Sequence, residues 1–143
     1  MKTIIPDASV LLKWVVPPAN EHHVEQAIAI RDALLDGRIR LLVPWLWYYE
    51  VGNTLGRKYP DYADALLSNL IDMDMENLSP DKAMQTVIIQ LVSRFQVTFY
   101  DAAYHALAIK QNGVFVTADA KYIQKSASAG HIMHLKDWTG STA

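Results

Sequence analysis

Three aspartates stand where a short apolar run gives way to a helical pattern. The runs and their acids are residues 2–5 with Asp7, residues 97–99 with Asp101, and residues 114–117 with Asp119. Ligands of open α/β sheets bind beyond the carboxyl ends of the strands. If the three strands are neighbours, their carboxylates converge on one edge of a sheet. Aspartate is also a preferred helix N-cap, and a carboxylate has two oxygens, so capping and ligand binding are compatible.

Glu50 differs from these acids because it lies well inside a predicted helix, where it caps nothing. Its neighbours within residues 45–53 are mostly aromatic or apolar. A buried carboxylate is costly unless it is paired or bound to a metal ion. Asn53 follows three residues later and shares the same helix face. The alternatives for Glu50 are a surface acid or an interhelical salt bridge.

Four carboxylates held close together cannot all ionise unaided, because each charge raises the pKa of its neighbours. A divalent cation removes this conflict. Oxygen ligands without cysteine or clustered histidine favour Mg²⁺ or Mn²⁺ over zinc, and we expect one or two ions per site. Such ions commonly act on phosphates. Two of them would change the formal charge of the chain from −2 to +2, so that the site could hold RNA locally.

Composition narrows the class of protein. The 143 residues, of which 51% are hydrophobic, predict one folded domain over residues 1–143, with residues 136–143 as a short C-terminal tail. The absence of cysteine excludes disulfides, thiolate zinc sites and a cysteine nucleophile. A pI near 6.2 argues against binding nucleic acid through bulk charge. Without a secretory signal or a long apolar run, we expect a cytoplasmic protein outside the membrane.

Short apolar strands alternate with helices along the chain. The predicted strands are residues 2–5, 40–43, 97–99, 114–117 and 132–135. The predicted helices are residues 8–16, 21–36 with Asn20 as N-cap, 45–58, 61–73, 80–95 with Ser79 as N-cap, 101–111 and 119–128. Continuous apolar strands separated by helices indicate a parallel sheet with both faces covered.

Four short motifs, in this order and at this spacing, resemble the PIN-domain family, most closely its VapC-type toxins. They are Ile5-Pro6-Asp7-Ala8-Ser9, Glu50-Val51-Gly52-Asn53, the segment 100–108 around Asp101, and Val116-Thr117-Ala118-Asp119. The resemblance implies a three-layer α/β/α sandwich with a mostly parallel sheet of about five strands in the order 3-2-1-4-5. It also implies a divalent-metal-dependent endoribonuclease.

The resemblance further implies roles for individual residues. The four acidic positions of the family are matched by Asp7, Glu50, Asp101 and Asp119. Of these, Asp7 and Asp101 would hold the principal metal ion, and Asp119 and Glu50 would complete it directly or through water. Hydroxyl and amide positions near the site are matched by Ser9, Thr117 and Asn53. Residues 120–122 lack the further acid that some members carry, which leaves a second metal ion open.

Partners are also implied. The resemblance suggests a homodimer and a cognate antitoxin whose C-terminal segment lies across the site. The aromatic residues between Trp45 and Tyr49 cannot all face one core, so we expect some in an interface; base stacking is the alternative. Basic residues that could contact the RNA backbone, or simply form solvated helix faces, are Arg57, Lys58, Lys110, Lys121 and Lys125.

The leading hypothesis is the toxin of a type II toxin–antitoxin pair, which cleaves structured RNA by metal-activated water. One alternative is a PIN nuclease that processes RNA without an antitoxin. A second alternative is a receiver-like phosphorylation module, which requires paired acids after the first strand, where this chain has only Asp7. A third is an acidic binding module whose acids only cap helices. None of the five histidines is assigned to catalysis.

Overall fold

The computed structural model describes residues 1–140, and within this range five strands form one parallel sheet. The strands are β1 (Lys2–Pro6), β2 (Ile39–Pro44), β3 (Glu76–Leu78), β4 (Val114–Thr117) and β5 (Ile132–His134). Their spatial order is β3-β2-β1-β4-β5, with parallel pairing throughout. The predicted fold class and strand order are confirmed.

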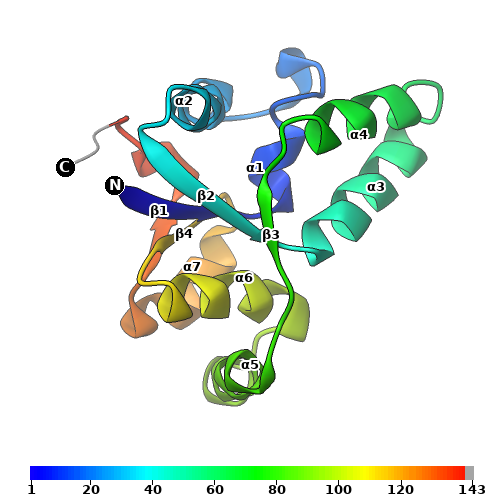
Figure 1. Cartoon of the computed structure of the whole chain (residues 1–143). Helices are drawn as coiled ribbons and strands as arrows, with labels where there is room; N and C mark the ends of the chain where they lie inside the picture. Colours follow the sequence, from blue (N-terminus) through cyan, green and yellow to red (C-terminus); the bar gives the residue numbers. More distant parts are fainter. Residues whose placement is uncertain (141–143) are drawn as a thin grey trace.

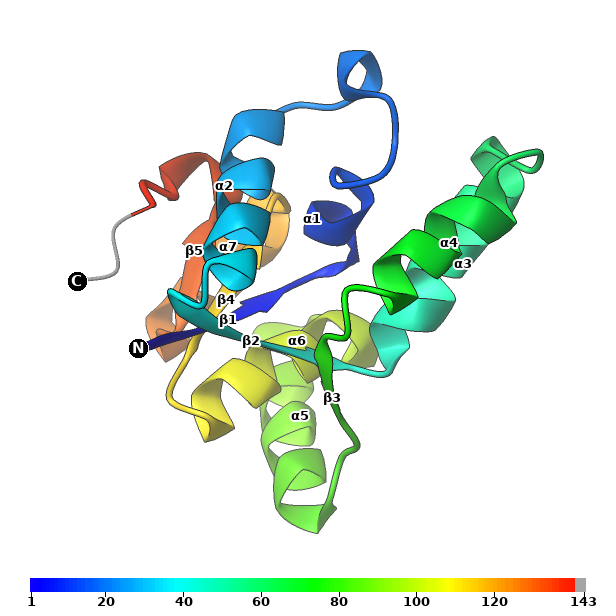
Figure 2. The same ribbon diagram turned by 45° about the horizontal axis from the view of Figure 1, so that its top comes forward.

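Helices cover both faces of the sheet (Figure 1). Those in the described part of the chain are α1 (Ala8–Leu12), α2 (Val24–Leu35), α3 (Leu46–Lys58), α4 (Ala63–Ile71), α5 (Lys82–Phe95), α6 (Phe99–Lys110) and α7 (Ala120–Ser126), with the 3-10 turns η1 (Pro18–Asn20), η2 (Ala127–Ala129) and η3 (Leu135–Asp137). Helices α1 and α2 lie on one face, and α5 and α6 lie on the other. Figure 2 shows α3 and α4 as a helical hairpin that extends beyond the sheet. Helix α7 contacts β5 and α5.

The chain reverses its direction of travel across the sheet after β3. From β1 it moves outward to β2 and β3, and it then returns to the other side of β1 to form β4 and β5. Neighbouring strands whose connections diverge in this way leave a crevice at their carboxyl ends. Asp7 directly follows β1, and Asp119 lies just beyond β4. The topology therefore brings these two acids to the same crevice.

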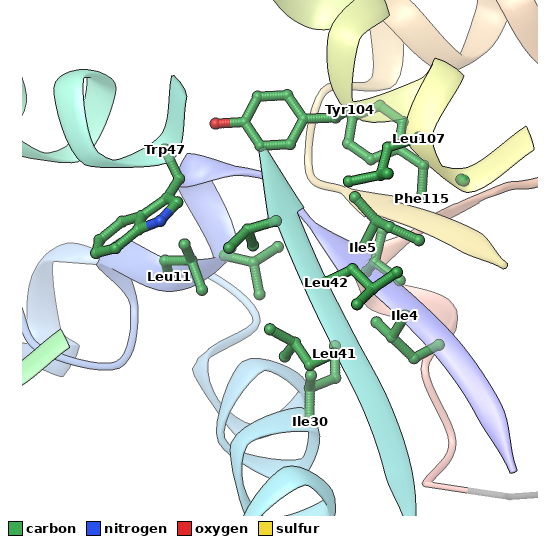
Figure 3. Packing of buried hydrophobic residues seen from close by; sticks show 14 of the residues in the cluster. Ile4, Ile5, Leu11, Ile30, Leu41, Leu42, Trp47, Tyr104, Leu107 and Phe115 are labelled. Carbon is green, nitrogen blue, oxygen red and sulfur yellow. The ribbon is translucent and has the colours of Figure 1, made fainter. Parts of the chain in front are cut away.

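The core lies between the sheet and its two helical layers (Figure 3). Ile4, Ile5 and Leu42 of the central strands are fully buried, as expected for strands of a parallel sheet covered on both faces. Tyr104 of α6 stacks on Phe115 of β4, with ring centroids 5.8 Å apart. Each such side chain contributes about 1.5–3 kcal/mol through burial. This packing holds α6 firmly against the sheet edge that carries the acids.

The predicted third strand over residues 97–99 is wrong. Gln96 ends α5 in the left-handed conformation, and Thr98 caps α6 by accepting the Asp101 amide at 3.1 Å. The third strand is instead β3, a short polar edge strand that apolar runs do not reveal. It pairs with β2, and the Arg40 and Glu76 side chains bridge the two strands at 2.7 Å. Asp101 consequently stands in the first turn of α6 and does not follow a strand.

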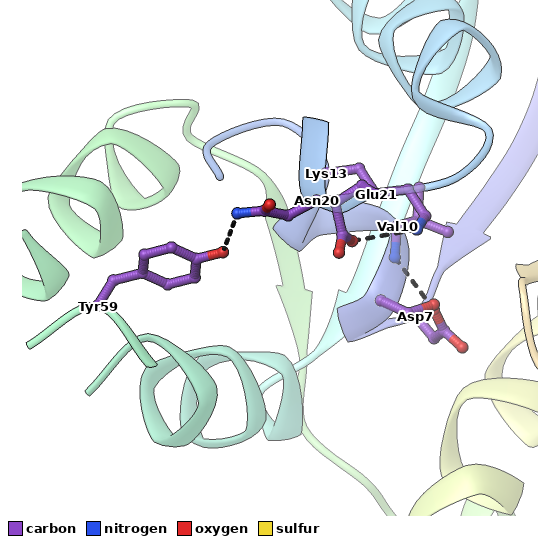
Figure 4. Close-up of polar contacts among 7 residues, drawn as sticks. Asp7, Val10, Lys13, Asn20, Glu21 and Tyr59 are labelled. Atoms are coloured by element: carbon purple, nitrogen blue, oxygen red, sulfur yellow. Dashed lines mark hydrogen bonds and ion pairs between the residues drawn. The ribbon is translucent and has the colours of Figure 1, made fainter. Parts of the chain in front are cut away.

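The predicted N-cap Asn20 is also wrong, because Asn20 lies in η1 and α2 begins only at Val24. The Asn20 side chain donates instead to the Tyr59 hydroxyl at 3.3 Å (Figure 4). Lys13, which directly follows α1, is buried and donates to Glu21 at 3.1 Å. These contacts hold the segment between α1 and α2 in place. The other predicted helices are present, with ends that differ by a few residues. The N-cap of α5 is Asp81 and not the predicted Ser79, because the Asp81 carboxylate accepts the Met84 amide at 2.8 Å.

The segment predicted as a C-terminal tail is described as far as residue 140, and residues 141–143 lie outside the described range. Residues Leu135–Asp137 form η3, and the Trp138 side chain is buried against the core. Among the described helices, none combines the length and the apolar character that a membrane span requires.

Candidate functional site

The four predicted acids line one pocket beside the carboxyl ends of β1 and β4. The pocket has a volume of about 340 Å³, and its lining consists of Asp7, Ala8, Ser9, Glu50, Asp101, Tyr104, Ala118 and Asp119. The acids come from four separate segments, namely the N-terminus of α1, the middle of α3, the first turn of α6 and the N-terminus of α7. Tertiary structure thus gathers carboxylates that are far apart in the sequence.

Asp7 is held by hydrogen bonds to both of its carboxylate oxygens. Oδ1 accepts the Ser9 hydroxyl at 2.5 Å and the Val10 amide at 3.3 Å, the second of which caps α1 (Figure 4). Oδ2 accepts the hydroxyl of Thr117 at 2.5 Å. The Thr117 oxygen in turn accepts the Asp119 amide at 3.0 Å. The buried Thr117 side chain therefore connects Asp7 to the loop that carries Asp119.

Glu50 is brought to the pocket by the packing of α3. Trp47, Val51 and Leu55 form the buried side of this helix, and Glu50 lies next to that side, half-buried. The Tyr104 hydroxyl donates to Glu50 Oε1 at 2.6 Å. Because the Tyr104 ring is locked against Phe115, this bond fixes where the Glu50 carboxylate lies.

Asp119 is the N-cap of α7 and accepts the Tyr122 amide at 3.1 Å. Its side chain thus combines capping with a position in the pocket, as does that of Asp7. Asp101 does not cap α6, because Thr98 performs that role. Its carboxylate is directed to the pocket without a capping bond, so helix capping does not account for it.

The acids perturb one another electrostatically. Burial raises the pKa of Asp7, Glu50 and Asp101. The negative charge of Asp101 further raises the pKa of Asp7 and of Glu50, and that of Asp119 raises the pKa of Asp101. The hydroxyl of Tyr104 lowers the pKa of Glu50 by stabilising its charged form. Bringing these carboxylates together therefore costs electrostatic free energy, which a bound cation would offset.

The donor chemistry of the pocket suits a hard divalent cation. Its four acidic side chains offer carboxylate oxygens, which Mg²⁺ and Mn²⁺ prefer, and the chain has no cysteine that could supply a thiolate ligand. Within residues 1–140, no three acidic or histidine side chains form a closed cluster that could hold a metal ion as they stand. The pocket therefore carries the ligand types that such a cation takes.

Of the other residues predicted for the site, some lie at the pocket and some do not. Ser9 lines the pocket and Thr117 contacts Asp7, whereas Asn53 is exposed on α3 and is not part of the lining. Lys121 and Lys125 line a second pocket that adjoins the acids. The remaining basic residues lie elsewhere, with Arg57 and Lys58 in the last turn of α3 and Lys110 in the last turn of α6.

Tyr104 is a residue of the pocket that the sequence motifs did not single out. It lies three residues after Asp101, so that both side chains share one face of α6. Applied to Asp101, the same spacing argument that linked Asn53 with Glu50 would have found it. Its pKa is raised by burial and by the charge of Glu50, so the hydroxyl stays protonated and acts as a donor.

The sequence and the fold together establish the family. The PIN domain model matches residues 4–127 of the chain. The chain belongs to the PIN domain family. No curated protein sequence is significantly similar to it.

Solved structures with the same fold include a VapC toxin and toxin–antitoxin complexes. PAE2754 from Pyrobaculum aerophilum is 22% identical, with a TM-score of 0.67 over 94% of this chain and 90% of that one. VapC20 from Mycobacterium tuberculosis, described as a toxin that cleaves the sarcin–ricin loop, is 15% identical, with a TM-score of 0.63 over 90% and 95%. A toxin–antitoxin complex from Klebsiella pneumoniae is 11% identical, with a TM-score of 0.66 over 92% and 97%. At these identities the likeness concerns the fold.

Proposed function

We propose that this PIN-domain protein is a divalent-metal-dependent endoribonuclease and the toxin of a toxin–antitoxin pair. The observation that carries the proposal is the convergence of Asp7, Glu50, Asp101 and Asp119 on one pocket at the divergence of β1 and β4. A site that only capped helices would need neither Glu50 nor Asp101, since neither acid caps a helix.

The residues of the pocket have distinct tasks in this proposal. Asp7 and Asp101 are the principal ligands of Mg²⁺ or Mn²⁺, and Glu50 and Asp119 complete the ligand set directly or through water. The hydroxyls of Ser9 and Thr117 keep Asp7 oriented and charged, as outer-shell partners of metal ligands do. A divalent ion bound there supplies polarisation of a phosphoryl oxygen and activation of water at neutral pH.

Tyr104 performs the corresponding task for Glu50. Its hydroxyl lies 2.6 Å from Oε1 and remains protonated, so it stabilises the carboxylate charge and orients the group towards the pocket. The second oxygen of Glu50 stays available for a ligand. These fixed hydroxyls reduce the reorganisation that the acids need when they take up a cation.

The toxin assignment draws on the complexes that share this fold, which include toxin–antitoxin pairs from several bacteria. We propose an antitoxin partner for this chain on that basis.

We also propose that a second copy of the chain covers the aromatic side chains that α3 leaves in solvent. Trp45 and Tyr49 are 50% and 70% exposed, and both line an apolar groove of about 300 Å³. Light scattering of the purified protein tests the dimer.

Cleavage of total cellular RNA tests the nuclease. The purified protein is incubated with Mg²⁺, with Mn²⁺ or with a chelator, and Asp101→Asn is compared with Asp64→Asn, which removes an exposed acid of α4 outside the pocket. Discrete fragments that need metal, vanish with Asp101→Asn and persist with Asp64→Asn are expected. RNA that stays intact in every condition, together with a melting temperature that Mn²⁺ does not raise, would refute the metal site.

A further inference from the structure

A second pocket opens directly beside the acidic one. It has a volume of about 430 Å³ and lies between the end of α5, the start of α6 and α7. Asp101 and Asp119 line both pockets. The second hollow, which we call the α7 groove, therefore adjoins the acidic pocket at these two side chains.

The α7 groove carries two positively charged side chains beside the acids. Lys121 and Lys125 line it from α7, and their spacing of four residues places both on one face of that helix. Both side chains are exposed, and neither forms an ion pair with an acid of residues 1–140. The Lys125 ammonium only approaches the Gln96 carbonyl, at 3.5 Å. Both ammonium groups are thus available to an anionic ligand.

We infer that the α7 groove binds the backbone phosphates of single-stranded RNA next to the phosphate that lies at the acids. This inference rests on the nuclease function proposed above. An RNA strand whose scissile phosphate occupies the acidic pocket carries further phosphates on either side. Those that enter the α7 groove meet the unpaired ammonium groups of Lys121 and Lys125. Lysine acts as a point charge toward phosphate, and grooves lined in this way follow the strand backbone.

The groove contacts the phosphate charges of the RNA and does not distinguish its bases. Its one aromatic lining residue, Tyr122, is buried, and its hydroxyl is held by His105 at 2.8 Å. It is therefore not free to stack on a base. We expect adenine and uracil oligomers of equal length to bind with equal affinity.

Fluorescence anisotropy with a labelled RNA strand of about eight nucleotides, a length within the usual site sizes, tests the inference. A chelator is present, so that binding is measured without cleavage. The variant Lys121→Gln/Lys125→Gln is compared with Arg57→Gln/Lys58→Gln, which removes the same charge from α3, outside the groove. Circular dichroism verifies that both variants keep the melting temperature of the wild type.

Two lysine–phosphate contacts predict a defined dependence of the RNA affinity on salt concentration. Each contact to a single strand contributes about 0.7 to the slope of log K against log salt. The Lys121/Lys125 variant should lower the magnitude of that slope by about 1.4 and weaken binding about 25-fold at ~0.1 M salt, if the two affinities converge near 1 M. The Arg57/Lys58 variant should bind like the wild type.

Three results would overturn the inference. They are equal loss of affinity in both variants, a wild type that does not bind the RNA, and an oligoglutamate of equal charge that binds as tightly as the RNA. Failure of the nuclease would look different. Wild type that binds RNA through Lys121 and Lys125 but never cleaves it would support the groove and refute the proposed function.

Discussion

Replacing Thr117 by valine tests whether the Asp7 carboxylate depends on the hydroxyl at the end of β4. Valine keeps the shape of threonine and puts a methyl group in place of the hydroxyl. In the wild type this hydroxyl donates to Asp7 Oδ2 at 2.5 Å and accepts the Asp119 amide at 3.0 Å. Thr117 is 1% exposed, so water does not replace the lost donor directly.

The magnitude follows from the bond that is lost. A hydrogen bond to a charged acceptor contributes about 1.5–3 kcal/mol, and the added methyl of valine recovers part of that through burial. We expect Thr117→Val to lower the free energy of unfolding by about 2 kcal/mol. For a chain of this size, that lowers the melting temperature by roughly 6 °C. Because the Thr117 hydroxyl lowers the pKa of Asp7, its removal should also weaken Mn²⁺ binding.

Urea unfolding of the metal-free protein measures the first effect, and the rise of the melting temperature with Mn²⁺ measures the second. Thr117→Ser is the matched control, because it keeps the hydroxyl and loses only a methyl group. Serine should retain most of the Mn²⁺ response, whereas valine should need a higher concentration for the same rise. The reasoning is refuted if valine unfolds within about 0.5 kcal/mol of the wild type, the range of neutral surface substitutions, or if serine and valine respond to Mn²⁺ alike.

Further predictions concern the framework of the site. Gly113→Ala places a methyl group 2.7 Å from the Thr3 carbonyl oxygen of β1, which is backbone and cannot turn aside; urea titration should show a loss of about 1–3 kcal/mol. Tyr104→Phe removes the donor to Glu50 and should reduce metal-dependent RNA cleavage while the far-UV spectrum stays unchanged; full activity would argue against the orienting role. Burial lowers the pKa of His105, so the unfolded chain binds a proton more readily. The free energy of unfolding attributable to His105 is therefore complete above its ordinary value of 6.5 and declines as the pH falls below it. Urea titrations of His105→Gln at several pH values should lack that component.

The sequence predicted the sheet because its central strands are continuous apolar runs. Within these runs, residues 4–5, 41–43 and 115–117 are buried in the structure, as continuous apolar runs indicate. The edge strand β3 was missed for the converse reason. Its residues Glu76 and Asn77 are polar, and they are stabilised by partners on other elements, Arg40 and Trp47. A local pattern contains no information about such partners.

The same contrast holds for the candidate site. Acid identity and spacing were sufficient to select Asp7 and Asp119, because an aspartate directly beyond a strand has its position determined by that strand. Asp101 was selected for a partly wrong reason, since residues 97–99 are a helix start and not a strand. It reaches the pocket because α6 packs across the sheet, which depends on tertiary contacts.

The chain by itself determined which residues have the chemistry, where the apolar strands lie and in which order the acids follow them. Tertiary structure alone decided that Tyr104 holds Glu50, and that Lys121 and Lys125, rather than Arg57, Lys58 or Lys110, line a groove next to the acids. The physical reason is the distance along the chain over which the determining interactions act. Strand and cap signals come from neighbours along the chain, whereas the position of one helix against another depends on the packing of the whole core.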